Sequence, residues 1–311
     1  MLNNQYGKIM EKTVIKQALN VFSKKKGMSK NELANKLGVS SATLSNIENE
    51  RWEKIKDEML LKIWNAIKGS DWQLVETSNF QTIFKTCEHA KEQHRMVGVI
   101  GATGTGKTTA LNEYYICNEN TFYIVCQKST TSRVFFKQLL REMGVLFAGT
   151  LYEMIERVAD ELNKREQPLL LIDEAGKLSQ TVLEHIHDLR NKTEHTTGIL
   201  MVGVEYFKTN LETAAKKNKE GMPEFYDRIA SWVELSTPRK DEIRSICEVN
   251  GITNPELVAR MQKSQTFRTL SNYIGNVKFH EKPIERFLQP QSSFNNSKAI
   301  ENKETAVEAF N

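Results

Sequence analysis

A short glycine-rich segment, Gly101–Thr108, constrains this chain more than any other part of its sequence. It reads Gly-Ala-Thr-Gly-Thr-Gly-Lys-Thr, follows the apolar residues Val97–Ile100, and has the spacing of a phosphate-binding loop. Glycines allow successive backbone N–H groups to turn toward one anion, and a helix that begins near Lys107 directs its positive dipole end to the same place. The segment therefore predicts a strand, a loop and a helix that together bind phosphate groups.

The residues of this loop have distinct expected roles. Lys107 reaches the β- and γ-phosphates, and the Thr108 hydroxyl holds Mg²⁺, so ATP and Mg²⁺ are the expected cofactors. The residues expected to bind the nucleotide are Gly101, Thr103, Gly104, Thr105, Gly106, Lys107, Thr108, Thr109 and Asp173.

A second motif supplies two adjacent carboxylates. The apolar run Leu169–Ile172 is typical of a strand buried on both faces, and Asp173 and Glu174 end it. Asp173 joins Thr108 as a ligand of Mg²⁺, and Glu174 polarises the attacking water. A solvated strand end is the simpler interpretation. The interval between the two motifs, however, has the length of the helices and strands of one nucleotide-binding sheet.

Bulk composition indicates a globular protein. The chain has 311 residues, of which 39% are hydrophobic and 26% charged, and it lacks both an apolar run of membrane-spanning length and a secretion signal. We therefore predict a cytoplasmic protein without a membrane partner. Four scattered cysteines predict neither a zinc site nor disulfides, and His185 and His187 would face different sides of a helix, which argues against a metal site there.

The N-terminal segment is basic and helical. Residues 1–68 contain thirteen basic and seven acidic residues, a net charge of +6, against +4 for the whole chain. Two short helices, 29–37 and 40–47, flank Gly38, which is the layout of a helix-turn-helix. Ser41, Thr43 and Asn46 would face outward from the second helix toward a DNA major groove. A pair of packed helices without a role in DNA binding is the alternative.

Hydrophobic periodicity divides the chain into four parts. We predict a helix-turn-helix domain at 1–70, a nucleotide-binding core at 71–236, a helical lid at 237–289 and a polar, loosely ordered tail at 290–311 with at most one short helix near 299–309. Residues 71–79 are predicted to form a linker. Expected strands are 97–100, 121–126, 169–172, 198–203 and 231–235; expected helices are 14–22, 29–37, 40–47, 59–67, 80–91, 132–143, 151–162, 180–192, 241–249, 255–263 and 268–279.

An α/β core with a parallel sheet, followed by a helical lid, resembles the AAA+ ATPases. The resemblance implies that Arg228 is an arginine finger, with Arg239 as its substitute, and that Arg268 is a second sensor of the γ-phosphate. The expected catalytic residues are therefore Glu174, Lys107, Arg228 and Arg268. Arg228 pairing with Asp227 or Glu224 at the surface is an alternative, as is an ordinary helix-start role for Arg268. Val204 departs from the family pattern, because a polar sensor is common there, and Glu205 or Thr197 could replace it.

Several segments resemble, more narrowly, the target-capture ATPases of DNA transposition of the phage Mu B type. They are Val75–Thr77, the strand from Thr197 to Gly203, Asp227–Ala230, and Lys240–Arg244 through Asn250-Gly251. The resemblance implies an ATP-dependent homo-oligomer that forms a helical filament on double-stranded DNA with little sequence preference. It also implies a DDE transposase as partner and hydrolysis of ATP for release. The helical C-terminal domain is longer in that family.

The same resemblance implies that basic side chains on helices lining the filament bore contact DNA phosphates, and of the candidates two or three should touch DNA. The candidates are Lys128, Arg133, Lys137, Arg141, Arg157, Lys164 and Arg165. Two other functions remain open: a helicase-loader-type ATPase, which fits the helix-turn-helix less well, and a transcriptional regulator that uses ATP only as a switch. The intact Glu174 argues against the regulator.

Overall fold

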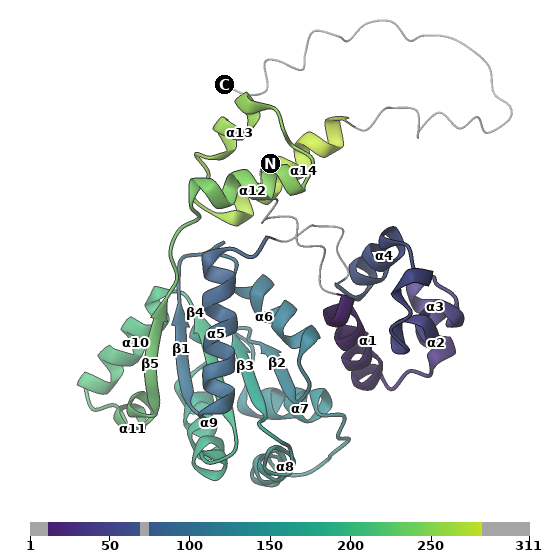
Figure 1. Ribbon diagram of the computed structural model, residues 1–311. Helices are drawn as coiled ribbons and strands as arrows, with labels where there is room; N and C mark the ends of the chain where they lie inside the picture. The colour runs from purple at the N-terminus through teal and green to yellow at the C-terminus, as the bar shows by residue number, and fades with distance from the viewer. Residues whose placement is uncertain (1–11, 69–74, 282–311) are drawn as a thin grey trace, which may run out of the picture. The chain divides into compact units, whose positions relative to one another are not determined.

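The computed structural model of the chain describes residues 12–68 and 75–281 (Figure 1). The tail predicted at 290–311, with its short helix, and the first part of the predicted linker, 71–74, lie outside the described residues.

The N-terminal domain is a small helical bundle. It consists of α1 (Lys12–Lys26), α2 (Lys30–Leu37), α3 (Ser41–Glu48), a 3-10 turn (Trp52–Lys54) and α4 (Asp57–Lys68). A capping box between Ser29 and Glu32 starts α2, and Gly38 ends it in the left-handed conformation with φ of 63°. The buried side chains of Leu33, Leu37, Leu44, Ile47 and Ile63 form its core. The predicted helix-turn-helix is confirmed.

A five-stranded parallel sheet forms the centre of the second domain. The strand order is β2 (Thr121–Val125), β3 (Leu169–Asp173), β4 (Gly198–Gly203), β1 (Met96–Ile100) and β5 (Ile229–Glu234). Every residue of β1, β3 and β4 is buried, as expected for strands covered on both faces. All carboxyl ends of the strands meet at one edge of the sheet, which we call the carboxyl edge, and all amino ends meet at the opposite amino edge.

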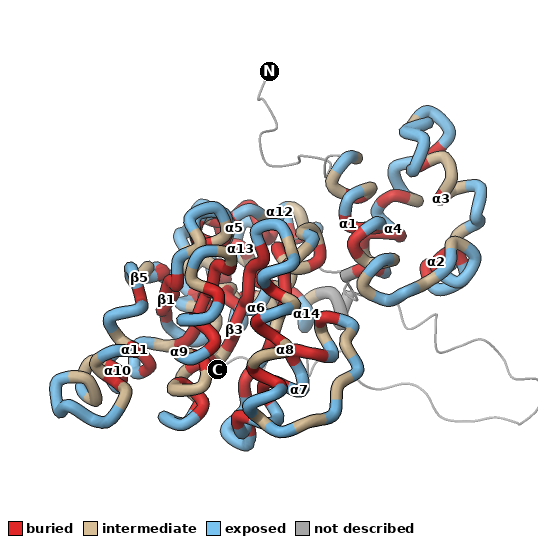
Figure 2. The backbone as a smooth tube through the Cα atoms, turned by 90° about the horizontal axis from the view of Figure 1, so that it is seen from below, coloured by how far each residue is buried: buried red, intermediate tan, exposed pale blue. Residues whose placement is uncertain are grey.

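Helices cover both faces of this sheet. Leu169 and Leu171 of β3 pack with α5 (Ser78–Glu92) and α6 (Lys107–Cys117), whereas Leu170 and Ile172 pack with α7 (Ser132–Glu142), α8 (Leu151–Asn163) and α9 (Gln180–Thr193). The alternation follows from the two-residue period of a strand. Figure 2 shows the consequence, since buried backbone runs through the middle and the outer sides of the helices are exposed.

Two helices were absent from the sequence prediction. They are α10 (Glu205–Lys216) and α11 (Met222–Asp227), between β4 and β5. Phe207 and Leu211 are the buried residues of α10. This i, i+4 pair is too short an apolar pattern to predict a helix from sequence.

Three further helices follow the sheet: α12 (Lys240–Val249), α13 (Pro255–Met261) and α14 (Phe267–Glu281). They correspond closely to the three helices predicted after residue 240. The predicted fold class is confirmed: a helix-turn-helix domain, a P-loop α/β core with a parallel sheet, and C-terminal helices. Within 12–68 and 75–281, no helix combines the length and the apolar character that crossing a membrane requires.

Candidate nucleotide-binding site

The glycine-rich loop connects β1 to α6 at the carboxyl edge of the sheet. Gly104 and Gly106 have φ of +83° and +88°, a conformation that side chains with a Cβ rarely adopt. A Cβ on Gly104 would also lie 2.9 Å from Cβ of Thr266 and 3.2 Å from Cβ of Arg268. Glycine at 104 is therefore needed both for the turn and for the close approach of the C-terminal helices.

Lys107 begins α6 and turns back over the loop. Its side chain is 8% exposed, and Nζ donates hydrogen bonds to the carbonyl oxygens of Gly101 and Ala102, both at 2.8 Å. Burial lowers the pKa of Lys107, while the charges of Asp173 and Glu174 oppose that shift. The ammonium group thus lies inside the loop, on the side of the two carboxylates.

Asp173 is the buried centre of a hydrogen-bonded group. The Thr108 hydroxyl donates to its Oδ2 at 2.7 Å, the Tyr123 hydroxyl donates to the same oxygen at 2.9 Å, and the Glu174 N–H donates to Oδ1 at 2.8 Å. Burial, together with the Asp173 charge, raises the pKa of the Tyr123 hydroxyl, which therefore remains a donor. The structure brings together the two predicted Mg²⁺ ligands, and their oxygen donors fit that hard cation.

Glu174 follows Asp173 in a left-handed conformation with φ of 55°. Such backbone is uncommon for a residue other than glycine, and here it turns the side chain out of the strand direction at the start of the 3-10 turn Ala175–Lys177. Glu174 lines the cavity above the loop, and its carboxylate lies 3.5 Å from the Lys177 ammonium group. Glu174 is thus a cavity-lining carboxylate, and its role in polarising water stays a prediction.

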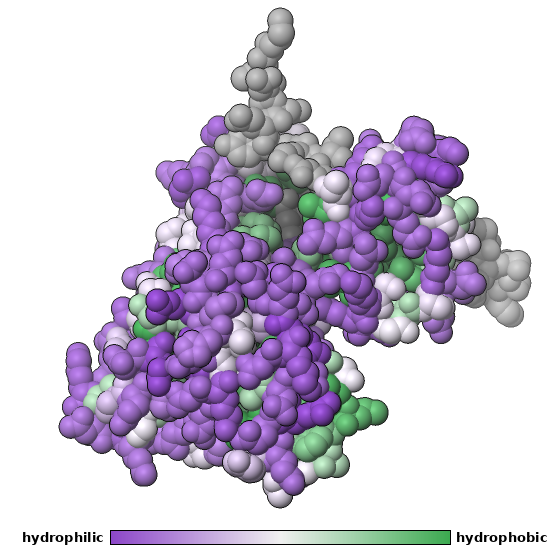
Figure 3. Space-filling view, turned by 60° about the horizontal axis from the view of Figure 1, so that its bottom comes forward, coloured by the Kyte–Doolittle hydropathy of each residue, from purple (hydrophilic) through white to green (hydrophobic). Residues whose placement is uncertain are grey.

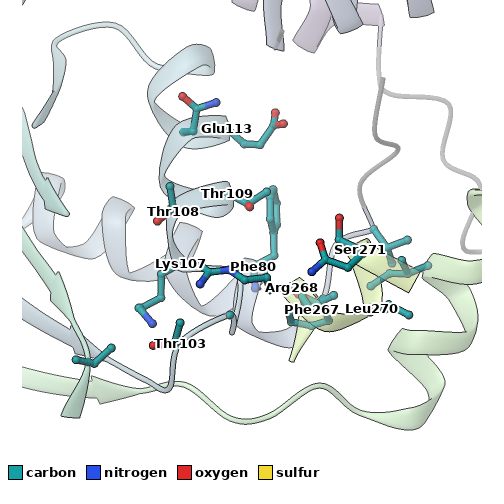
Figure 4. Close-up of a pocket in the computed structure, with 18 of the residues that line it drawn as sticks. Phe80, Thr103, Lys107, Thr108, Thr109, Glu113, Phe267, Arg268, Leu270 and Ser271 are labelled. Atoms are coloured by element: carbon teal, nitrogen blue, oxygen red, sulfur yellow. Dashed lines mark hydrogen bonds between the residues drawn. The ribbon is translucent and has the colours of Figure 1, made fainter. Parts of the chain in front are cut away.

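A cavity of about 530 Å³ opens beside the loop. Figure 4 shows residues of α6 on one side of it and residues of α14 on the other. Its volume lies within the range of small-ligand sites. Of the predicted loop residues, Thr103, Gly104, Gly106, Lys107, Thr108 and Thr109 line it; lining residues that the sequence analysis missed include Val75, Phe80, Asn112, Glu113, Phe267 and Ser271.

Asn79 supports the loop from α5 and was also missed. We predicted a linker up to residue 79, but α5 begins at Ser78, and Asn79 is only 5% exposed. Its amide donates to the carbonyl oxygens of Thr105 at 3.1 Å and Ser236 at 2.7 Å, and its Oδ1 accepts from the Ser236 N–H at 3.1 Å. One side chain therefore ties the phosphate loop to the segment that follows β5.

The predicted sensor positions fall in different places. Val204 lines the cavity directly after β4, whereas Glu205 is an exposed residue at the start of α10. Thr197 precedes β4 at the amino edge, where its carbonyl accepts from Arg190, so it lies at the wrong end of the strand to replace the sensor. Arg268 lines the cavity, and its charge contributes to the lowered pKa of Lys107.

Arg228 lies at the amino edge, directly before β5. Its side chain is 42% exposed and pairs with Glu194 at 3.2 Å, not with Asp227 or Glu224. The phosphate loop of the same chain is at the opposite edge. Arg239, the predicted substitute, pairs with Asp241 at the start of α12 and is 60% exposed.

The predicted DNA-binding side chains divide into two groups. The first, which we call the α8 group, lies on α8 and in the two residues after it: Arg157 and Arg165 each lie 2.9 Å from the Glu161 carboxylate, and Lys164 lies 3.6 Å from it. The second group consists of the exposed side chains Lys128, Arg133, Lys137 and Arg141. Within the described part of the chain, none of them forms an ion pair.

The second helix of the helix-turn-helix, α3, carries the other predicted contacts. Ser41 is exposed at its first turn, while Thr43 and Asn46 are partly buried. The Thr43 hydroxyl lies 2.9 Å from the Ser40 hydroxyl, which caps the helix by accepting from the Thr43 N–H at 3.1 Å. Ser41 is therefore the most accessible of the three.

Comparison with protein families defines the class. A model of the AAA domain matches residues 90–211, and a model of the helix-turn-helix matches residues 15–69. The fold and these matches together indicate an AAA-type domain that follows a helix-turn-helix domain in the sequence. The structure of the Aeropyrum pernix ORC2 protein has the same core fold, with a TM-score of 0.53 and 12% identity. That match covers 69% of this chain and 64%, less than two thirds, of the ORC2 chain.

Among individual proteins, the chain is similar to two proteins B of Mu-like phages. It is 25% identical over 250 residues to the DNA transposition protein B of the Mu-like prophage FluMu of Haemophilus influenzae, covering 76% of this chain and 84% of that protein. It is also 25% identical over 254 residues to the ATP-dependent target DNA activator B of Escherichia phage Mu, a match that covers 78% of this chain and 80% of that protein. The resemblance predicted from the motifs is confirmed.

Proposed function

We propose that this protein is an ATP-dependent activator of target DNA in transposition. In its ATP-bound form it assembles as a filament on double-stranded DNA, delivers that DNA to a DDE transposase, and releases it after hydrolysis. The observation that carries the proposal is the similarity to proteins B over more than three quarters of the chain, and the adjacent carboxylates Asp173 and Glu174 support it.

The side chains at the carboxyl edge have the chemistry for hydrolysis. Lys107 and the backbone N–H groups of the loop bind the β- and γ-phosphates, and Glu174 orients a water molecule toward the γ-phosphorus. Thr108 and Asp173 would hold Mg²⁺, which supplies neutralisation of the phosphate charge. Tyr123 positions Asp173 by its hydrogen bond of 2.9 Å.

The cavity walls provide the nucleoside site and a contact with the C-terminal helices. Phe80 of α5 and Phe267 of α14 offer aromatic surface to a base, and Arg268 adds a positive charge near the phosphate loop. Arg228 would act on the nucleotide of a neighbouring copy, because its own phosphate loop lies at the other edge of the sheet. ATP binding and assembly would thereby be coupled.

DNA contact is proposed for the unpaired basic side chains of α7. Arg133, Lys137 and Arg141 are spaced four residues apart, so they lie along one face of the helix at intervals of about 6 Å. The α8 group is less suited, since all three of its cations are held by ion pairs to the Glu161 carboxylate. We therefore narrow the predicted contacts to Lys128 and the three α7 residues.

Two charge-matched triple variants test this assignment. R133Q/K137Q/R141Q should reduce the dependence of DNA affinity on salt by about three units of slope, because about one counterion is released for each phosphate neutralised. R157Q/K164Q/R165Q removes the same charge from α8 and should change the slope by less than about one. Equal losses in the two variants would contradict the choice of α7.

Assembly is tested by electron microscopy of the full chain with ATP and a long duplex. Filaments support target activation, whereas isolated dimers at one sequence would favour a transcriptional regulator. A rate of ATP hydrolysis that is the same with and without DNA would also count against the proposal.

A further inference from the structure

The loop between α7 and α8 presents an unusual apolar tip. Leu146 is 96% exposed, and Tyr152, in the first turn of α8, is 69% exposed. Figure 3 shows a group of apolar side chains projecting from the lower right margin of the molecule, on the side where this loop lies in Figure 1. Single exposed leucines are common, but few are as completely exposed as this one.

The loop around Leu146 is held rigidly. Val145 and Phe147, on either side, pack against the core of the sheet domain. The N–H groups of Gly144 and Val145 donate to the last turn of α7, at 3.0 Å to Arg141 and 2.8 Å to Leu140. The capping box of Thr150 and Glu153 fixes the start of α8. The loop therefore holds the Leu146 side chain in an exposed position.

The tip continues the basic row of α7. Arg141 occupies the last turn of that helix, five residues before Leu146, and Arg133 and Lys137 precede it on the same face. Of the two carboxylates next to the tip, Glu153 accepts from the N–H and hydroxyl of Thr150, and Glu142 accepts from the Tyr115 hydroxyl. A row of cations that ends in an apolar side chain matches the chemistry of a DNA backbone next to a base stack.

We propose that Leu146 is a wedge that enters the base stack of the duplex held by α7 and locally unstacks it. This inference rests on the proposed DNA binding and adds a deformation of the DNA to it. Apolar wedges inserted between base steps are an established way for proteins to kink a duplex. The occupant is DNA, and not a second copy of the chain, because the tip is continuous with the unpaired cations.

The test uses the full chain with ATP and a duplex that contains 2-aminopurine, whose fluorescence rises when its base is unstacked. At saturating protein we expect a several-fold rise with the wild type, little rise with L146S, and recovery with L146M, which keeps the apolar volume. V134S is the matched control, because Val134 is also exposed, at 41%, but lies at the other end of α7. L146S should keep the salt dependence of DNA binding.

Three results would overturn the wedge: a wild type that binds DNA without a rise in fluorescence, an undiminished rise with L146S, or loss of self-association by L146S in sedimentation without DNA. The last would assign the tip to an interface between copies. Failure of the wild type to bind DNA would instead contradict the proposed function, so the two failures can be told apart.

Discussion

The two edges of the sheet both carry charged groups that the proposed function links to hydrolysis, but the surrounding structure holds them differently. At the carboxyl edge, Lys107 and Asp173 are buried. Lys107 donates to carbonyl oxygens of the phosphate loop, and Asp173 accepts from the Thr108 hydroxyl. At the amino edge, Arg228 is exposed and pairs with a partly exposed Glu194. The first arrangement is complete within one chain.

A second arginine of the amino edge clarifies the contrast. Arg190 is 7% exposed, and its guanidinium donates to the carbonyl oxygens of Thr197 at 2.8 Å and His94 at 2.7 Å. Burial lowers its pKa, and its hydrogen bonds hold the loops before β4 and β1 together. Arg190 is therefore structural, whereas Arg228 can exchange its partner. An arginine that must reach another subunit has to be able to leave its partner within its own chain, as Arg228 can.

The largest expected effect concerns the carboxyl edge. Glu174→Gln removes the carboxylate that polarises water but keeps the shape of the cavity. General-base catalysis is typically worth about 10²–10⁴-fold, so we expect ATP turnover to fall by at least about 100-fold while ATP binding persists. Steady-state hydrolysis and equilibrium binding of a fluorescent ATP analogue measure the two quantities.

Glu166→Gln is the matched control for this variant. Glu166 is exposed before β3, at the amino edge, and its loss should leave turnover unchanged. A Glu174→Gln protein that still hydrolyses ATP at half the normal rate would contradict the assignment of chemistry to the carboxyl edge.

A smaller effect is expected from Asn79→Ala. The change leaves the carbonyl oxygens of Thr105 and Ser236 without their buried donor, which costs about 1–3 kcal/mol of stability. Because Thr105 belongs to the phosphate loop, affinity for ATP should fall as well. Urea unfolding and ATP titration check both effects.

Asn163→Ala serves as the comparison. Asn163 is exposed at the end of α8, where its amide donates to the carbonyl oxygen of Lys192 at 3.2 Å. Asn163→Ala should lower the free energy of unfolding and the affinity for ATP by less than Asn79→Ala. Equal effects of the two substitutions would show that Asn79 does not support the loop.

The parts of the site that could be predicted from sequence are those whose interaction partners lie close to them in the chain. The phosphate loop, Asp173 and Glu174 were predicted because their chemistry depends on neighbours in sequence and on the end of a buried strand. The helix-turn-helix was predicted for the same reason, since its caps at Ser29 and Ser40 lie within three residues of their partners. Fold class follows from the alternation of such elements.

The residues that sequence did not predict depend on distant contacts. Tyr123 bonds Asp173 only because β2 and β3 are neighbours in register, a pairing that hydrophobic pattern alone does not fix. Asn79 bonds groups on the phosphate loop and after β5, 26 and 157 residues away. The exclusion of Thr197 as sensor likewise required knowing at which edge of the sheet it lies.

The smallest expected effect tests the exchangeable partner of Arg228. Glu194→Gln removes the charge that holds this arginine in the single chain. An exposed ion pair contributes about 0–1 kcal/mol, so releasing it should raise hydrolysis in the DNA-assembled protein by no more than about fivefold, and less at high salt. The rise should vanish in the double variant R228A/E194Q, which lacks the released group. Turnover with saturating DNA at two salt concentrations measures it. If the rise persists in the double variant, Glu194 acts through another residue. Arg228 would then not be the arginine that leaves its partner to act on a neighbouring subunit, and the contrast with Arg190 would fail.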